Sequence, residues 1–128
     1  MPVIVHSLNQ IADENIKSQI IKIYQHTHEF TDGEQAYQAL AQAVEQDTQF
    51  YVAIFNDKII ASIWSTGTGD SRLLKHIVVH PANRGRGIAE RLISEVCRLE
   101  EEKGVQHFQP YCPAIRKTLI KLGKWSES

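Results

Sequence analysis

The chain has 128 residues, of which 42% are hydrophobic, and its formal net charge is −1. This length is enough for one domain with one hydrophobic core and excludes two domains of ordinary size. A net charge near zero without a long basic run excludes the electrostatic surface that nucleic-acid-binding proteins need.

The cysteines, the histidines and the first residues indicate the environment of the protein. Cys97 and Cys112 fit neither a disulfide framework nor a cluster of metal ligands. Residues 1–6 lack the charged and long apolar segments of a secretion signal. His26 and His28 are two positions apart, so on a helix they would point away from each other. We therefore expect a cytoplasmic protein with reduced thiols and no bound metal.

One strand and two helices are predicted in the first third of the chain. A short apolar strand comes first, at residues 3–5. Apolar residues recur at helical spacing in residues 13–26 and again in residues 33–46. Two amphipathic helices therefore precede the main part of the sheet.

The middle of the chain predicts an antiparallel meander. Residues 49–55 and 58–65 are rich in β-branched and aromatic side chains, and Asn56-Asp57 between them is typical of a hairpin turn. A glycine-rich break follows, and then a strand at residues 72–79 whose apolar end is suited to burial.

The last third predicts a helix at residues 85–103, stopped by Gly104, a strand at residues 105–111 and a helix at residues 114–122, stopped by Gly123. No linker or repeat interrupts the series. The order is β-α-α-β-β-β-α-β-α, which indicates a mixed α/β domain over residues 1–128.

The most informative motif joins the strand at 72–79 to the helix that follows. It reads His80-Pro81-Ala82-Asn83-Arg84-Gly85-Arg86-Gly87-Ile88-Ala89. Its glycines allow a tight turn, and the first N–H groups of the helix point into that turn, where the helix dipole favours negative charge. Arg84 and Arg86 add attraction for phosphate. The motif therefore predicts a main-chain site for a pyrophosphate.

The spacing of the motif decides between families of nucleotide-binding proteins. Neither the Rossmann fingerprint nor the Walker loop is present. The motif instead resembles the acetyl-CoA signature of the GNAT acyltransferases, through Arg84, Gly87 and Ala89, preceded by Val79 and Pro81. Strand, proline, motif and helix stand in the order that the family has.

This resemblance implies the GNAT fold, an α/β (α+β) architecture in which a mixed central sheet is flanked by helices. Strands 74–79 and 105–111 would splay apart. Family members usually continue past the last helix into two more strands, whereas this sequence stops at Trp125-Ser126-Glu127-Ser128. An unfinished sheet edge has to be paired or covered. We therefore expect a second copy or a different protein to pack near that end.

The resemblance also implies acetyl-CoA as the cofactor. Main-chain groups of Ile77, Val78 and Val79 would pair with the pantetheine arm, and an N–H, that of Val78, would polarise the thioester carbonyl. The pyrophosphate would be held by the amides of Arg84, Gly85, Arg86, Gly87, Ile88 and Ala89. The alternative is that Ile77 and Val79 are only core residues, although main chain can bind while side chains pack.

Candidate catalytic residues are less defined. Many family members use a tyrosine in the last helix as the acid, and that position holds Leu119. Tyr111 is the best substitute by location, unless it is a buried structural tyrosine. His76 is a candidate base on the cofactor strand, unless it is a solvated strand histidine. Glu29 and Asp32 could recognise a cationic amine, or could form a solvated acidic turn.

Two functions from different classes follow from the resemblance. The first is an N-acetyltransferase that acts on a small amine or a protein amino group by direct attack in a ternary complex. The second is a non-catalytic acetyl-CoA sensor, because the chain is also similar to the small GNAT proteins that bind the aspartate decarboxylase precursor. That similarity lies in the Phe55-Asn56 hairpin, its distance from the glycine turn, the missing tyrosine and the tryptophan near the end. A GNAT scaffold that has lost its ligand is a third possibility, and the intact glycines argue against it.

Overall fold

The structure is a computed structural model that describes residues 3–126. In chain order its elements are β1 (Ile4–Ser7), α1 (Glu14–Tyr24), α2 (Gly33–Ala43), β2 (Thr48–Phe55), β3 (Lys58–Thr66), β4 (Ser71–Val79), the 3₁₀ turn η1 (Pro81–Asn83), α3 (Ile88–Glu102), β5 (His107–Pro110) and α4 (Pro113–Lys121). The predicted order of strands and helices is confirmed, and η1 was not predicted. Glu127 and Ser128, the last two residues of the given sequence, lie outside the described residues.

The first two helices begin at aspartates that cap them. The Asp13 carboxylate accepts hydrogen bonds from the first-turn N–H groups of Asn15 and Ile16, and Asp32 accepts one from Gln35. Because α1 ends at Tyr24, His26 and His28 lie in the α1–α2 loop and not on a helix. The expected helix to residue 26 was therefore about two residues too long.

The five strands of the described chain form one sheet in the order β1-β2-β3-β4-β5. All neighbouring pairs are antiparallel except β4 and β5, which are parallel. Asn56 and Asp57 have φ values of 52° and 61°, the left-handed pair that a two-residue hairpin turn requires. The predicted β2–β3 hairpin is confirmed.

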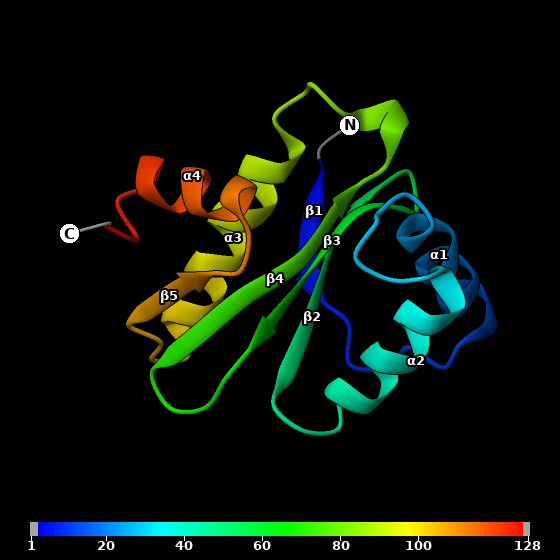
Figure 1. Cartoon of the computed structure of the whole chain (residues 1–128), viewed down its shortest axis with the longest axis horizontal. Helices are drawn as coiled ribbons and strands as arrows, with labels where there is room; N and C mark the ends of the chain where they lie inside the picture. Colours follow the sequence, from blue (N-terminus) through cyan, green and yellow to red (C-terminus); the bar gives the residue numbers. More distant parts are fainter. Residues whose placement is uncertain (1–2, 127–128) are drawn as a thin grey trace.

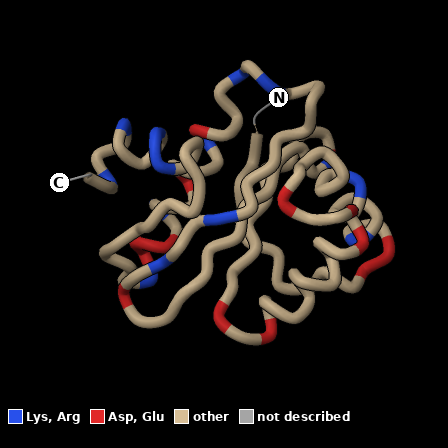
Figure 2. The backbone as a smooth tube through the Cα atoms, viewed as in Figure 1, with Lys and Arg blue, Asp and Glu red and all other residues tan. Residues whose placement is uncertain are grey.

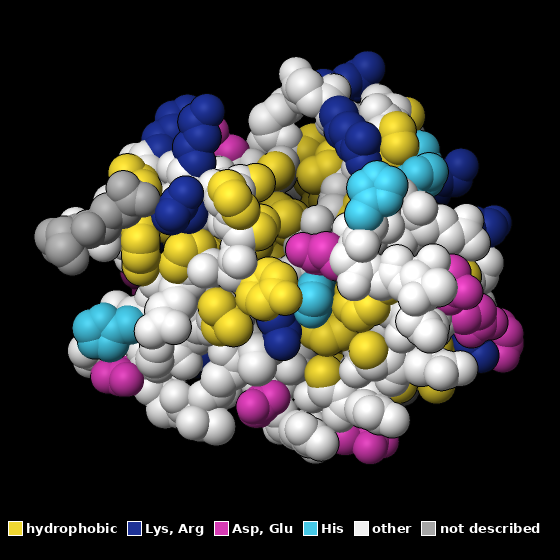
Figure 3. Space-filling view, viewed as in Figure 1, with side chains coloured by type: hydrophobic (Ala, Val, Ile, Leu, Met, Phe, Trp, Pro, Cys, Tyr) yellow, Lys and Arg dark blue, Asp and Glu magenta, His cyan; other side chains and the backbone are white. Residues whose placement is uncertain are grey.

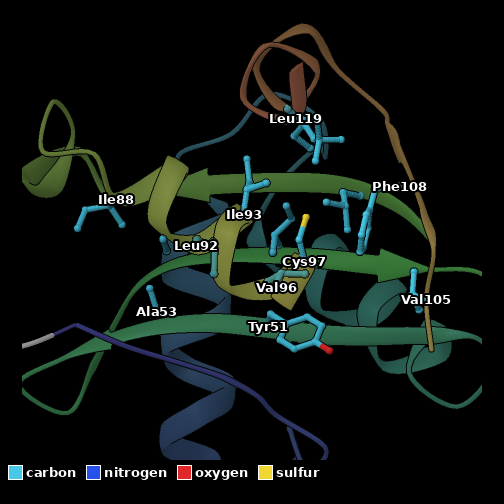
Figure 4. Close-up of a cluster of buried hydrophobic side chains, with 14 of the residues drawn as sticks. Tyr51, Ala53, Ile88, Leu92, Ile93, Val96, Cys97, Val105, Phe108 and Leu119 are labelled. Carbon is cyan, nitrogen blue, oxygen red and sulfur yellow. The ribbon is translucent and has the colours of Figure 1, made fainter. Parts of the chain in front are cut away.

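Helices cover both faces of the sheet, α1 and α2 on one and α3 and α4 on the other (Figure 1). Each face has its own buried cluster. On the α1–α2 side the cluster includes Tyr24, Leu40 and Trp64, and on the α3–α4 side it includes Leu92, Val96 and Leu119 (Figure 4). Within residues 3–126, no helix combines the length and the apolar character that crossing a membrane would take.

Strands β4 and β5 stay together over only half of β4. The paired residues run from Ser71 to Leu74 on β4 and from His107 to Pro110 on β5. Beyond Leu74, β4 continues to Val79 while the chain after β5 turns away into α4 (Figure 1). The expected splayed strand pair is therefore present, with its closed end at Ser71 and its open end at Val79.

A buried ion pair fastens the closed end. The Arg72 guanidinium on β4 lies 2.7 Å from the Glu100 carboxylate on α3, and Glu100 is 1% exposed. The Ser65 hydroxyl and the Tyr51 hydroxyl also donate to that carboxylate. Each strand from β2 to β4 thus contributes a partner to one buried acid, which links the three strands to α3.

The outer edge of β5 offers little for pairing. The N–H groups of His107 and Tyr111 donate towards the β4 side, to the carbonyls of Asp70 and Leu74. Because N–H directions alternate along a strand, the Phe108 N–H faces outward. The next outward-facing position is Pro110, which has no N–H. The edge is therefore short and blunted by Pro110.

Candidate functional site

The turn before α3 has the backbone that the sequence predicts. Gly85 and Gly87 have φ values of 78° and 74°, in the left-handed region that side chains disfavour. A Cβ built on either glycine would meet no atom within 4 Å. The backbone conformation thus requires both glycines, and the space in front of them is open to a ligand.

The N-terminus of α3 is left without a cap. Gly87 occupies the cap position and provides no side-chain hydrogen bond, and the first main-chain bond of the helix joins the Arg91 N–H to the Gly87 carbonyl, at 3.1 Å. The N–H groups of Ile88, Ala89 and Glu90 therefore precede the first helical bond. Basic residues lie on this turn and on α4 nearby (Figure 2). This arrangement suits an anion.

Two cavities meet at this turn. One, of about 300 Å³, lies between the turn and Thr118 of α4. The other, of about 470 Å³, lies in the gap where β4 leaves β5, and Val79, Arg84 and Ala89 line both. The two cavities therefore adjoin, and together they form a hollow whose size suits a cofactor. The face in Figure 3 shows this hollow, with hydrophobic side chains exposed in it.

The register of β4 determines which of its main-chain groups face the larger cavity. The His80 N–H donates to the Ile60 carbonyl of β3, and Val78 pairs with Ser62 of β3. By alternation the N–H and C=O of Val79 face away from β3, towards the cavity, and so does the C=O of Ile77, which shares a peptide plane with the Val78 N–H. The expectation that the Val78 N–H polarises a thioester is therefore wrong, because that N–H is directed to β3.

A bulge in β4 lies directly before these residues. Lys75 pairs with Trp64 and Val78 pairs with Ser62, so β4 carries one more residue than β3 between the two pairs. His76, within the bulge, has a φ of 56°. Its carbonyl accepts a hydrogen bond from the Tyr24 hydroxyl at 2.8 Å. The bulge is thus attached to the end of α1.

The His76 imidazole is enclosed by side chains from separate elements. Its Nδ1 lies 2.8 Å from a carboxylate oxygen of Glu29, in the α1–α2 loop. The ring centroids of Trp64, Phe30 and Tyr111 lie 4.5, 4.7 and 5.4 Å from its own. The His76 side chain is only 13% exposed. The alternative of a solvated strand histidine is therefore wrong.

Burial lowers the pKa of His76, and the hydrogen bond to Glu29 opposes that shift. Because the pKa of His76 is lowered, the imidazole is neutral near pH 7, in the state that can accept a proton. On the face shown in Figure 3, an acidic side chain lies beside a histidine where β4 crosses the view, with hydrophobic side chains on both sides.

The structure brings three of the four candidate side chains together. Glu29, His76 and Tyr111 meet around the bulge, and Tyr111 is 55% exposed, so the alternative of a buried structural tyrosine is wrong. Asp32 does not join them, because its carboxylate caps α2. We therefore remove Asp32 from the candidate acceptor site.

Comparison with known proteins shows to which family the chain belongs. The protein-family model described as "Acetyltransferase (GNAT) domain, PanZ" matches residues 2–109. The chain belongs to the GNAT acetyltransferase family. The model also bears out the resemblance to the small acetyl-CoA-sensing GNAT regulators. A comparison with curated protein sequences gives no match.

Solved structures show the same GNAT fold at low sequence identity. The ribosomal-protein-S18-alanine N-acetyltransferase of Escherichia coli is 18% identical, with a TM-score of 0.75 over 95% of this chain and 77% of that one. A GNAT acetyltransferase of Staphylococcus aureus is 16% identical, with a TM-score of 0.74 over 88% and 87%. The aminoglycoside acetyltransferase AAC(6')-Iy, solved with a CoA-containing bisubstrate analogue, is 16% identical, with a TM-score of 0.74 over 100% and 94%.

The last helix differs from the GNAT pattern at the position where many members carry the tyrosine that acts as an acid. Leu119 of α4 is fully buried and packs in the α3–α4 cluster (Figure 4). It contributes to the core and carries no group that could transfer a proton.

Several residues around the larger cavity and the bulge were not predicted. His26, Thr27 and His28 line the larger cavity together with Ile77 and Val79. Tyr24 holds the bulge. The helical spacing of Tyr24 marked it as a core residue, but nothing in the sequence indicated that the loop after it folds over β4.

Proposed function

We propose that this GNAT protein binds acetyl-CoA in the two joined cavities and transfers the acetyl group to a primary amine of a small molecule or a protein. The observation that carries this proposal is the hollow formed by the two adjoining cavities, between the open end of β4 and the uncapped N-terminus of α3. A pantetheine arm needs main-chain partners, and a pyrophosphate needs an anion site, and these two features lie side by side.

The residues that would hold acetyl-CoA follow from the geometry. The Val79 N–H and the Ile77 C=O are directed away from β3 and could pair with the amides of the pantetheine arm, as could the Val79 C=O after Arg84 moves away from it. The Arg84 N–H donates to the Pro81 carbonyl within the turn, so the expected main-chain role of Arg84 is withdrawn. The amides from Gly85 to Ala89 would hold the pyrophosphate in the open space before α3, and the Arg84 and Arg86 side chains add positive charge.

The Arg84 side chain contacts the same strand. Its Nε donates to the Val79 carbonyl at 3.1 Å. Pairing of that carbonyl with a pantetheine amide would displace the guanidinium and leave it available to a phosphate.

The reacting end lies at the bulge. Bound acetyl-CoA supplies an acyl group that is activated as a thioester. Transfer forms a nitrogen–carbon bond while the carbon–sulfur bond breaks, and we assign to Nε2 of His76 the proton that the amine nitrogen loses. The carbon–sulfur bond leaves its electron pair on the thiolate sulfur of CoA, which then takes up a proton, and we assign the exposed Tyr111 hydroxyl as the candidate donor.

Calorimetric titration with acetyl-CoA and with CoA tests the binding site. A Gly87→Trp variant fills the open space before α3, and we expect its affinity to fall about a hundredfold or more, as for loss of several charge-assisted hydrogen bonds. Gly104→Trp is the matched control, because Gly104 has a φ of 99° and the same open surroundings at the other end of α3. Equal affinity of both variants would contradict the assignment.

A second function is supported by a specific observation. The acid position of α4 holds the buried Leu119, and the matching family model carries the PanZ description. Both favour an acetyl-CoA-binding regulator of a partner enzyme, such as the aspartate decarboxylase precursor. Parent protein that binds acetyl-CoA tightly, acetylates none of a panel of polyamines, amino acids and peptides, and binds that precursor only with acetyl-CoA present would establish this function in place of transfer.

We also propose that a protein partner or a second copy packs beside β5. A cavity of about 400 Å³ lies there, between the strand and the segment that includes Lys124 and Trp125. Because Pro110 blunts the strand edge, side chains around this cavity would make the contact, and not an added strand.

A further inference from the structure

His76 is held in an unfavourable backbone conformation by groups from other elements. Its positive φ is uncommon for a residue with a side chain, and such a conformation persists only where the surroundings over-determine it. The Tyr24 hydroxyl donates to its carbonyl, and the Trp64 indole N–H donates to that hydroxyl at 3.0 Å. The structure thus maintains a strained residue directly before Ile77, which lines the larger cavity.

Glu29 determines the protonation pattern of the imidazole. A carboxylate can only accept hydrogen bonds, so at 2.8 Å it requires a proton on Nδ1 of His76. In the neutral ring, Nε2 is then the unprotonated nitrogen. The Glu29 side chain is 30% exposed and comes from a loop, so an amine substrate that enters the site could contact it.

The charged and titratable groups around the ring come from four elements. They are Tyr24 at the end of α1, Glu29 in the α1–α2 loop, Lys75 beside His76 on β4 and Tyr111 after β5. The Tyr24 hydroxyl is engaged by the His76 carbonyl, and the Lys75 ammonium lies over the Trp64 ring, 5.8 Å from its centroid. Glu29 is therefore the group that acts on the imidazole nitrogen directly.

We propose that Glu29 is a positioning residue, which fixes His76 in the tautomer whose Nε2 faces the reaction and stabilises the imidazolium that forms there. This inference rests on the proposed acetyl transfer and replaces the expected role of Glu29 in recognising a cationic amine. As the amine loses its proton to Nε2, the ring becomes positive, and the Glu29 carboxylate 2.8 Å from Nδ1 offsets that charge.

A Glu29→Gln variant tests the role, because it removes the charge and keeps an oxygen that can accept from Nδ1. We expect kcat to fall about tenfold or more while the KM for acetyl-CoA changes little. The His76 pKa should fall further, because the carboxylate raises it, so the acidic limb of the kcat/KM profile should move to lower pH. NMR titration of labelled histidine, assigned with a His76→Gln spectrum, measures that pKa directly.

Glu34→Gln is the matched control, since it removes an equal charge from the exposed first turn of α2. It should leave the rate, the pH profile and the His76 titration as in the parent. A Glu29→Gln variant with an unchanged pH profile and a rate within about twofold of the parent overturns the inference and leaves the proposed transfer intact. Parent protein that binds acetyl-CoA but acetylates no amine overturns the proposed transfer itself, and the positioning role with it.

Discussion

At the scale of single residues, the state of His76 couples chemistry to stability. Enclosure by Phe30, Trp64 and Tyr111 keeps its ring from water and lowers its pKa below the ordinary value of 6.5. The unfolded chain therefore binds a proton at His76 at a higher pH than the folded chain does. Between the His76 pKa of the folded chain and that of the unfolded chain, the unfolded state holds more protons, so the free energy of unfolding rises with pH.

We predict that the parent loses stability as the pH falls from about 7.5 to about 5.5 and that His76→Gln loses less. The measurement is the free energy of unfolding in urea at both pH values. His107→Gln, at an exposed position of β5, is the control and should lose as much as the parent. Identical losses in the parent and in His76→Gln would remove His76 as a contributor to acid sensitivity.

At the scale of elements, the Glu100 carboxylate shows how α3 is fixed to the sheet. It lies under the closed end of the β4–β5 pair and accepts from Arg72, Ser65 and Tyr51. Burial and Glu100 raise the pKa of Tyr51 well above its ordinary value, which keeps that hydroxyl protonated as a donor. The paired charges are stable together, but neither is suited to burial alone.

Glu100→Gln should therefore destabilise the fold by about 3–5 kcal/mol, because it leaves the Arg72 guanidinium buried without its counter-charge. Urea unfolding followed by circular dichroism measures this. Glu95→Gln removes an acid that pairs with Arg98 at the surface of the same helix, and we expect about 0–1 kcal/mol. A similar small effect for both variants would show that the buried pair contributes little.

The elements also show how far sequence reasoning extends. Apolar periodicity, the Asn56-Asp57 turn and the glycine turn before α3 are local signals, and each predicted its element. Strand β5 is shorter than the predicted 105–111, since Val105 packs in the core outside the ladder. The contact between Glu29 and His76 was not predictable, because it depends on a bulge and a loop path that have no local signature.

At the scale of the whole molecule, the sheet carries two buried clusters and two open edges. One edge is β1, where Ile4 is 56% exposed, and the other is β5, blunted by Pro110. Association through added strands is therefore disfavoured at β5, and the cavity beside Trp125 is the better contact surface.

We predict that a Trp125→Ala variant weakens association with the partner or the second copy, while Ile4→Ser does not. Light scattering over a wide concentration range, with and without the partner, gives the molecular mass. Trp125 also packs against the α3–α4 cluster, so the unfolding free energy of the variant must be measured alongside. A parent that is monomeric at all concentrations and with every partner tested would contradict the proposed contact.

The divergence of β4 from β5 gives the molecule an asymmetric stiffness. Buried charges anchor β4 at Arg72, whereas at Val79 no neighbouring strand restrains it on the β5 side. On its other side this half of β4 stays paired with β3 up to Val79. A guest that enters the gap should consequently displace the α4 side of the opening, and leave the β3–β4 ladder unchanged.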